Sequence, residues 1–249
     1  MRRAISLLKA FGPKRYELGV SELSRLTGLH KTTVYRLLVT LEEEGCIQHN
    51  QSNDKYSLGP ALIGLGRMVL DNIDIARQAL PHMRDLVEET GETAMLEVWD
   101  DSRPLVVANV DGKRFTHMIA RAGYHLPAHG SSGGKAMLAF LSAEEIDKVI
   151  ARGLKQYTEN TITDRERLLE ELARIRAAHV SYDRQEVDIG VCAVSAPIFD
   201  HLGRIAGTLT VAGPTQRIQM DEDSTLVQLI KRTAEAISRD LGYQILPQT

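Results

Sequence analysis

The sequence SELSRLTGLHKTTVYRLL, residues 21–38, decides the fold of the N-terminal part of this chain. It places a short helix, a turn at Gly28 and a second helix in the order that a helix-turn-helix requires. Ser21 is the expected N-cap of the first helix, and Leu23 and Leu26 are expected on its buried face. This pattern predicts a DNA-reading unit.

The spacing of the second helix fixes its two faces. Its apolar residues recur at helical spacing and predict a buried stripe of Val34, Leu37, Leu38 and Leu41. At about 100° per residue, Thr32 and Arg36 point away from that stripe. Hydroxyl groups and positive charge suit phosphates and base edges. The residues that we expect to contact DNA are Ser21, His30, Lys31, Thr32, Thr33, Tyr35, Arg36 and Lys55.

A hairpin is expected next, with strands over 46–49 and 55–58 and a polar turn over 50–54. A hairpin directly after a recognition helix is a wing, although a small helical bundle capped by a hairpin is the alternative. Residues 1–60 contain nine Lys and Arg and six Asp and Glu, whereas the remainder has a net charge of −6. The net charge of +3 at the proposed DNA-binding end agrees with phosphate contacts.

The chain of 249 residues is long enough for two domains, and 43% hydrophobic residues permit a core. We expect a DNA-binding domain over 1–59, a linker helix over 60–72 and a second domain over 73–249. Because the only two cysteines lie one in each domain, a disulfide framework is not expected, and a cytoplasmic location is. No signal peptide and no membrane span are expected.

The second domain shows a mixed pattern that predicts an α+β fold. Helices are expected over 75–89, 134–141, 143–151, 164–178 and 221–241, and strands over 93–99, 105–110, 114–119, 191–199 and 204–211.

Three segments carry a family resemblance: residues 21–45, 123–138 and 190–214. In their order and spacing they resemble the IclR family of bacterial transcription regulators over essentially the full length. The resemblance implies an N-terminal winged helix-turn-helix, a linker helix and a C-terminal GAF-like effector-binding domain with an antiparallel sheet. It also implies a homodimer or a dimer of dimers on a palindromic operator. Residues 3–8 begin the first helix almost at once, so the start is expected to be clipped.

The segment 130–134, Gly-Ser-Ser-Gly-Gly, matches the G-x-S-x-G nucleophile elbow, and a serine hydrolase using Ser132 is one alternative function. That motif needs a preceding strand, which Pro127 disfavours, and nothing pairs Asp183 with His201 as the other members of a triad. A phosphate loop would need glycine at His129 and a hydroxyl at Ala136. We therefore expect no catalytic residues.

A better use for this loop is ligand capture, because small residues before a helix leave amides exposed for an anion. A tight turn packed against the sheet is an equal alternative on the residues alone. With the hydroxyl of Ser131 added, the family resemblance implies an effector site formed by Ser131, Ser132, Gly133, Asp183, Ala193, Thr210 and Ala212. Cys192 is displaced by one place from a cysteine of some members, which reverses its face.

The expected effector is a small organic molecule that is anionic or hydroxylated, and Asp183 favours a hydroxy acid or a sugar acid. His125 and His129 are expected to make loop hydrogen bonds instead of binding a metal, and no cofactor is expected. Trp99 is expected in the core or at a dimer surface. The sequence thus predicts a ligand-responsive regulator, with repression favoured over activation. An architectural DNA-binding protein without an effector is the second alternative.

Overall fold

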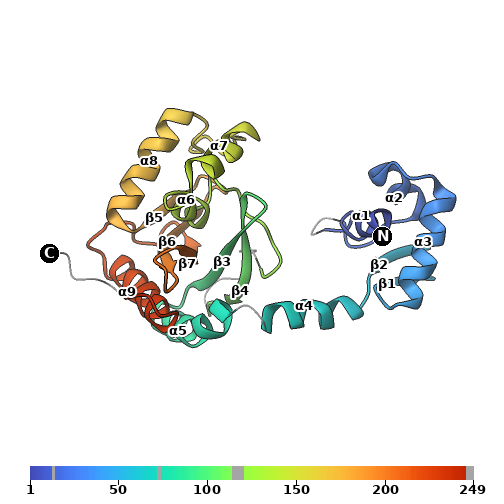
Figure 1. The fold of residues 1–249 in the computed structure, drawn as a ribbon, viewed down its shortest axis with the longest axis horizontal. Helices are drawn as coiled ribbons and strands as arrows, with labels where there is room; N and C mark the ends of the chain where they lie inside the picture. Colours follow the sequence, from blue (N-terminus) through green and yellow to red (C-terminus); the bar gives the residue numbers. More distant parts are fainter. Residues whose placement is uncertain (13–14, 72–73, 114–120, 245–249) are drawn as a thin grey trace. The chain divides into compact units, whose positions relative to one another are not determined.

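The computed structural model describes residues 1–12, 15–71, 74–113 and 121–244 (Figure 1). The chain forms two compact units, Met1–Asn72 and Ile73–Thr249, and each is described by itself. Within the described residues, no helix is both long and apolar enough to cross a membrane.

The first unit is a winged helix-turn-helix followed by a further helix (Figure 1). Its elements are α1 (Arg2–Leu8), α2 (Val20–Thr27), α3 (Lys31–Glu43), β1 (Ile47–Asn50), β2 (Lys55–Leu58) and α4 (Ala61–Asp71). Helices and wing share one core, formed by Leu7, Leu18, Leu23, Val34, Leu38, Ile47 and Tyr56. The predicted helix pair, its turn and its hairpin are confirmed.

Two details of α2 differ from the prediction. Gly19, and not Ser21, is the N-cap, and the Glu22 carboxylate accepts a hydrogen bond from the Gly19 amide at 2.9 Å. The helix therefore starts two residues earlier than a cap at Ser21 would place it. Val20 packs against the core that contains Leu23, whereas Leu26, which was expected on the buried face, is 44% exposed.

Gly59 fixes the base of the wing to the end of α3. A Cβ added at Gly59 would overlap the carbonyl oxygen of Gly45 and crowd the backbone of the next two residues. The Gly59 amide donates to the Cys46 carbonyl at 2.8 Å, and the Ala61 amide donates to the Gly45 carbonyl at 3.1 Å. Only glycine permits this approach of two backbones.

The second unit is built on a five-stranded antiparallel sheet with the order β4-β3-β7-β6-β5. Its strands are β3 (Thr93–Asp100), β4 (Arg103–Val110), β5 (Ser181–Arg184), β6 (Val191–Phe199) and β7 (Ile205–Pro214). Its helices are α5 (Asp74–Thr90), α6 (Ser132–Leu138), α7 (Ala143–Ala151), α8 (Arg165–Ala178) and α9 (Thr225–Asp240). Helices α5 and α9 pack on one face of the sheet, α6 covers the other face, and α8 packs on α6 (Figure 1).

The predicted α+β class and antiparallel sheet are confirmed. The helix expected over 134–141 begins two residues earlier, at Ser132, because Ser131 caps it. Strand β5 was not anticipated, and the strand expected over 114–119 lies outside the described residues. Trp99 packs against the cluster between α6, α7 and α8, and its Nε1 donates to Glu145 at 3.0 Å, which agrees with the core position expected for it.

Candidate DNA interface and effector site

Helix α3 has the two faces that its spacing predicted. Val34 and Leu38 are fully buried against the unit's core. On the opposite side, Thr32 and Arg36 are exposed, and Tyr35 is 55% exposed. His30, the N-cap, and Lys31 are also exposed, whereas Thr33 is half-buried. The exposed N-terminal half of α3 therefore presents hydroxyl, imidazole and cationic groups together.

Ser21 and Lys55 belong to the elements that precede and follow α3 in the sequence. Ser21 is exposed in the first turn of α2, and Lys55 is half-buried at the start of β2. The wing turn is fixed by Glu17, whose carboxylate accepts hydrogen bonds from the Asn50 and Asn53 side chains at 3.0 and 2.8 Å. The hydrogen bond from Asn50 is the main reason why the pKa of Glu17 is lowered.

Sheet register brings most of the expected effector residues together on the face that α6 covers. Asp183 pairs with Ala193, and Ala193 pairs with Ala212. Thr210 lies two residues from Ala212 and pairs with Ser195. Because strand side chains alternate between faces, all five belong to the same side of the sheet. Cys192 belongs to the opposite side, as its displacement predicted.

A chain of buried hydroxyl groups connects this face to α6. Ser195 Oγ donates to Ser132 Oγ at 2.7 Å and shares a 2.6 Å hydrogen bond with Thr210 Oγ1. The neighbouring Ser131 has a structural role, since its Oγ accepts from the Gly134 amide at 3.1 Å and donates to the Pro127 carbonyl at 2.8 Å. Ser132, and not Ser131, is therefore the serine that faces the sheet.

Glu97 of β3 places a fully buried carboxylate against the first turn of α6. A Cβ added at Gly133 would overlap Glu97 Oε2, so this glycine makes room for the acid. Thr208 Oγ1 lies 3.5 Å from Oε2, and Oε1 has no hydrogen-bond partner among the described residues. Burial raises the pKa of Glu97 to about 7, the hydroxyls of Thr210 and Thr208 oppose this rise, and the Asp183 charge adds to it.

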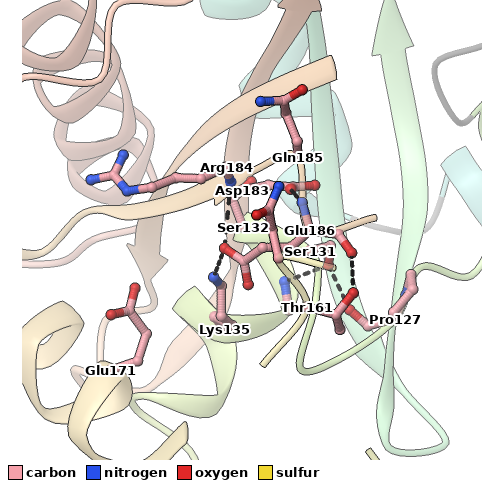
Figure 2. A network of polar contacts seen from close by, with 12 residues as sticks. Pro127, Ser131, Ser132, Lys135, Thr161, Glu171, Asp183, Arg184, Gln185 and Glu186 are labelled. Carbon is pink, nitrogen blue, oxygen red and sulfur yellow. Dashed lines mark hydrogen bonds and ion pairs between the residues drawn. The ribbon is translucent and has the colours of Figure 1, made fainter. Parts of the chain in front are cut away.

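Asp183 belongs to a second buried network, which Figure 2 shows. Its Oδ1 accepts from the Glu186 amide at 2.6 Å, and the Glu186 carboxylate pairs with Lys135 Nζ at 2.5 Å. Lys135 projects from α6 and is fully buried. The pKa of Asp183 is raised to about 7, mainly by burial; the hydrogen bond from the Glu186 amide and the charge of Lys135 oppose this rise, and the charge of Glu186 adds to it. Thr161 Oγ1 holds the loop by donating to the Glu186 carbonyl at 2.6 Å.

An apolar wall adjoins these polar groups. It consists of Met95, Val106, Ala193 and Ala212, with Leu126 packed against them. The site thus combines hydroxyls, buried carboxyl groups and a small apolar surface, which is the mixture typical of a pocket for a small organic molecule.

Sequence reasoning missed four residues of this site: Glu97, Lys135, Glu186 and Ser195. Two of them left a signal. Glu97 is the only charged residue in the strand expected over 93–99, and Ser195 is two residues from Ala193 and so shares its face. Lys135 and Glu186 meet only through the tertiary fold, and nothing in their local sequence pairs them.

The alternative of a hydrolase using Ser132 is contradicted by the geometry. Ser132 is hydrogen-bonded to a serine hydroxyl and not to a histidine, and Asp183 is bonded to the Glu186 amide. His129 Nε2 lies 2.9 Å from the Lys155 carbonyl, and His125 Nε2 lies 2.8 Å from Asp100. The expected loop hydrogen bonds of these histidines are confirmed. The described residues contain no cluster suited to a metal ion.

A separate cavity of about 950 Å³ lies where the C-terminal end of α8 approaches α9. Its lining includes His179, Lys231, Glu235 and Tyr243 and none of the expected effector residues. Lys231 Nζ donates to the Ala178 carbonyl at 2.9 Å, so its charge caps α8. This cavity provides a natural control region for the effector site.

Comparison with known proteins gives matches along nearly the whole chain. Residues 1–51 match the IclR helix-turn-helix domain, and residues 67–239 match the bacterial transcriptional regulator IclR C-terminal domain. The chain is 31% identical over 244 residues to the transcriptional regulator XynR of Escherichia coli K12, which covers 98% of this chain and 97% of that protein. It is 27% identical over 248 residues to the transcriptional repressor AllR of the same strain, covering 99% and 92%.

One solved structure is an IclR homolog from Microbacterium hydrocarbonoxydans in complex with 4-hydroxybenzoate. It superimposes with a TM-score of 0.83 and 25% sequence identity, covering 96% of this chain and 97% of that one.

Proposed function

The chain belongs to the IclR family of bacterial transcriptional regulators, and we propose that it is a cytoplasmic repressor of the metabolite-responsive kind. In this proposal residues 1–59 bind a palindromic operator, and residues 73–249 bind a small organic effector that is anionic or hydroxylated. Residues 60–72 form the linker between these two domains. The observation that carries it is the face of α3 on which Thr32, Tyr35 and Arg36 are exposed together. A relative named as a repressor supports the direction of control.

The DNA contacts proposed are those of the exposed α3 face, the first turn of α2 and the wing residue Lys55. Selection of bound sequences from a random DNA pool with the full-length protein would yield the operator. Hydroxyl-radical footprinting should then show two half-sites separated by about one helical turn or a multiple of it. A single, asymmetric footprint would contradict the palindromic operator.

The homo-oligomer is supported by the exposed apolar side chains of α4. Ile63 is 75% exposed and Leu65 is 53% exposed, and a second copy of the chain would cover them. Sedimentation of the wild type against an Ile63→Ser, Leu65→Ser double variant should show weakened assembly in the variant. Equal assembly of the two would place the interface elsewhere.

The effector site proposed is formed by Ser132, Gly133, Asp183, Ala193, Thr210 and Ala212. Its support is that these residues lie on α6 and on the sheet face that α6 covers. A Ser132→Trp variant should fill this region and abolish ligand-dependent stabilisation in a thermal-shift screen of hydroxy acids, sugars and phenols. A Glu235→Trp variant in the separate cavity is the control. Unchanged ligand stabilisation in folded Ser132→Trp protein would exclude this site.

A further inference from the structure

Glu97 occupies the place where the sequence analysis expected a ligand anion. Its carboxylate lies on the first turn of α6, so close to Gly133 that no side chain fits there. The end of α6 that begins at Ser132 faces this carboxylate, and the Gly134 amide of that turn is already bonded to Ser131 Oγ. An acidic ligand at this turn would therefore lie beside a buried acid of the protein itself.

Among the described residues, no cation is paired with the Glu97 carboxylate. Lys135 is paired with Glu186 at 2.5 Å, so its charge is already matched. The Arg184 side chain extends away from the network (Figure 2). Its guanidinium lies over the Tyr182 ring, 4.3 Å from the ring centre. Asp183 is near enough for its charge to raise the pKa of Glu97. Among the described residues, two carboxyl groups thus share this face without a cation of their own.

Unsatisfied acceptors point to what the site lacks. Glu97 Oε1 is fully buried and has no hydrogen-bond partner among the described residues. Ser181, which lies opposite Ser195 in the register, has a buried Oγ that also has no hydrogen-bond partner among the described residues. Buried carboxylate oxygens are nearly always hydrogen-bonded, and an unpaired one is destabilising. A ligand group that donates hydrogen bonds would satisfy Glu97, whereas a carboxylate would not.

We propose that Glu97 is the specificity-determining residue of the effector site and selects ligands that present a hydroxyl or ammonium donor to it, against carboxylates. This inference rests on the proposed effector site and narrows its ligand class. The apolar wall of Met95, Val106, Ala193, Ala212 and Leu126 contacts the ligand's hydrocarbon part, and the hydroxyls of Ser132 and Thr210 add further polar contacts.

The test uses sets of ligands that differ in one group. The first set is 4-hydroxybenzyl alcohol, 4-hydroxybenzylamine and 4-hydroxybenzoate, and the second is glucose, glucosamine and glucuronate. Calorimetric titration of the full-length wild type should show the alcohol or the amine binding at least about tenfold more tightly than the acid. The alcohol and amine arms distinguish a neutral donor from a cationic one.

Glu97→Gln keeps the size of the side chain and removes its charge. In this variant we expect the preference for the alcohol or the amine over the acid to fall by at least about tenfold. Asp183→Asn should lower the same preference. Glu235→Gln removes one acid in the separate cavity and should keep the wild-type ratio of the affinities for alcohol, amine and acid. Circular dichroism and thermal unfolding establish that each variant is folded.

Each outcome decides the inference. Equal affinity of the wild type for acid and alcohol, or an unchanged ratio in Glu97→Gln, would overturn it. Acid binding that appears only in Glu97→Gln supports it, even where the wild type binds no member of either set. Absence of binding by both proteins counts against a ligand role for Glu97. Tight acid binding that Ser132→Trp abolishes would refute the donor preference while leaving the proposed effector site intact.

Discussion

What a single residue of this protein is expected to do depends on whether the fold buries or exposes it. Glu97 is the only charged residue within 93–99, and the fold places it fully buried against α6. Arg36, by contrast, acts through exposure, because the stripe of Val34 and Leu38 turns it outward. The two residues lead to predictions of different kinds, one about stability and one about binding.

Glu97 should make the protein less stable as pH rises. Because the folded state raises its pKa from 4.5 to about 7, the unfolded chain loses this proton first. Between these two pH values the free energy of unfolding should fall, and above pH 7 the full penalty of about 3 kcal/mol applies. Urea unfolding at pH 5 and pH 8 should show a smaller loss in Glu97→Gln, which is the more stable protein at pH 8.

Asp183 contributes a slope of the same sign, since its pKa is also raised to about 7. Some pH dependence should therefore remain in Glu97→Gln. Parallel stability curves for wild type and variant would show that Glu97 is charged at no energetic penalty in the fold.

Arg36 and Lys55 should affect DNA binding differently. Arg36→Ala should cost about 1–3 kcal/mol and relax sequence preference, because we propose that the exposed Arg36 contacts base edges. Lys55→Ala should weaken binding to all sequences alike and reduce the salt dependence, as loss of a phosphate contact does. Fluorescence anisotropy with the selected operator and a scrambled duplex at several salt concentrations separates the two effects.

Arg232→Ala, at an exposed position of α9, is the matched control and should change neither quantity. Full specific affinity in a folded Arg36→Ala, Thr32→Ala protein would mean that another surface reads the DNA.

At the scale of elements, glycines decide where segments can approach or bend. Gly59 lies where the end of the wing meets the end of α3, and a Cβ there would overlap backbone. Gly64 in α4 meets no atom within 4 Å and so has no such requirement. The same substitution should therefore have opposite effects at the two positions.

Gly59→Ala should destabilise the DNA-binding unit by more than about 2 kcal/mol, because two backbones must separate. Gly64→Ala should stabilise α4 by about 1 kcal/mol, the difference between the two residues in a helix. Denaturant unfolding followed by circular dichroism measures both. A neutral Gly59→Ala would show that the wing base is not held by this contact.

The winged helix-turn-helix could be predicted from the sequence because its signals are local: helical spacing in α3, a glycine turn and a short hairpin. The exact cap of α2 could not, since Ser21 and Gly19 compete for it and the Glu22 hydrogen bond decides. In the second unit, strands β6 and β7 followed from their patterns. Strand β5 did not, because its four residues carry too short a pattern.

The effector site, too, could be predicted only in part. Asp183, Ala193, Thr210 and Ala212 were placed by family resemblance, and the strand register brings them to one face. The carboxylate at the first turn of α6 was not foreseen, because an acid in an apolar strand gives no hint of what lies across from it. The proposed preference for a hydrogen-bond donor over an anion rests on that one contact, which the sequence did not show.

At the scale of the whole molecule, effector and operator must be linked in both directions. An effector that lowers operator affinity by a given factor must itself bind less tightly, by the same factor, when the operator is present. Calorimetric titration of a ligand found in the thermal-shift screen, with and without saturating operator, measures one factor. Anisotropy titration of the operator, with and without effector, measures the other, and unequal factors would mean that the two ligands do not act on one equilibrium.

The buried hydroxyls of Ser132, Ser195 and Thr210 have a consequence that follows from counting protons. Each hydroxyl carries one proton, so a chain in which Ser195 donates to Ser132 requires Thr210 to donate to Ser195. Thr210 then has only lone pairs to offer Glu97, so a hydrogen bond between the two needs a protonated carboxyl. An ionised Glu97 instead accepts a hydrogen bond from Thr210, which lowers the Glu97 pKa, so that Ser195 donates to Thr210 and Ser132 donates to Ser195. Ser132 offers a proton to its surroundings in the first order and only lone pairs in the second, so the charge on one carboxylate sets the polarity of a hydrogen bond three residues away along the relay.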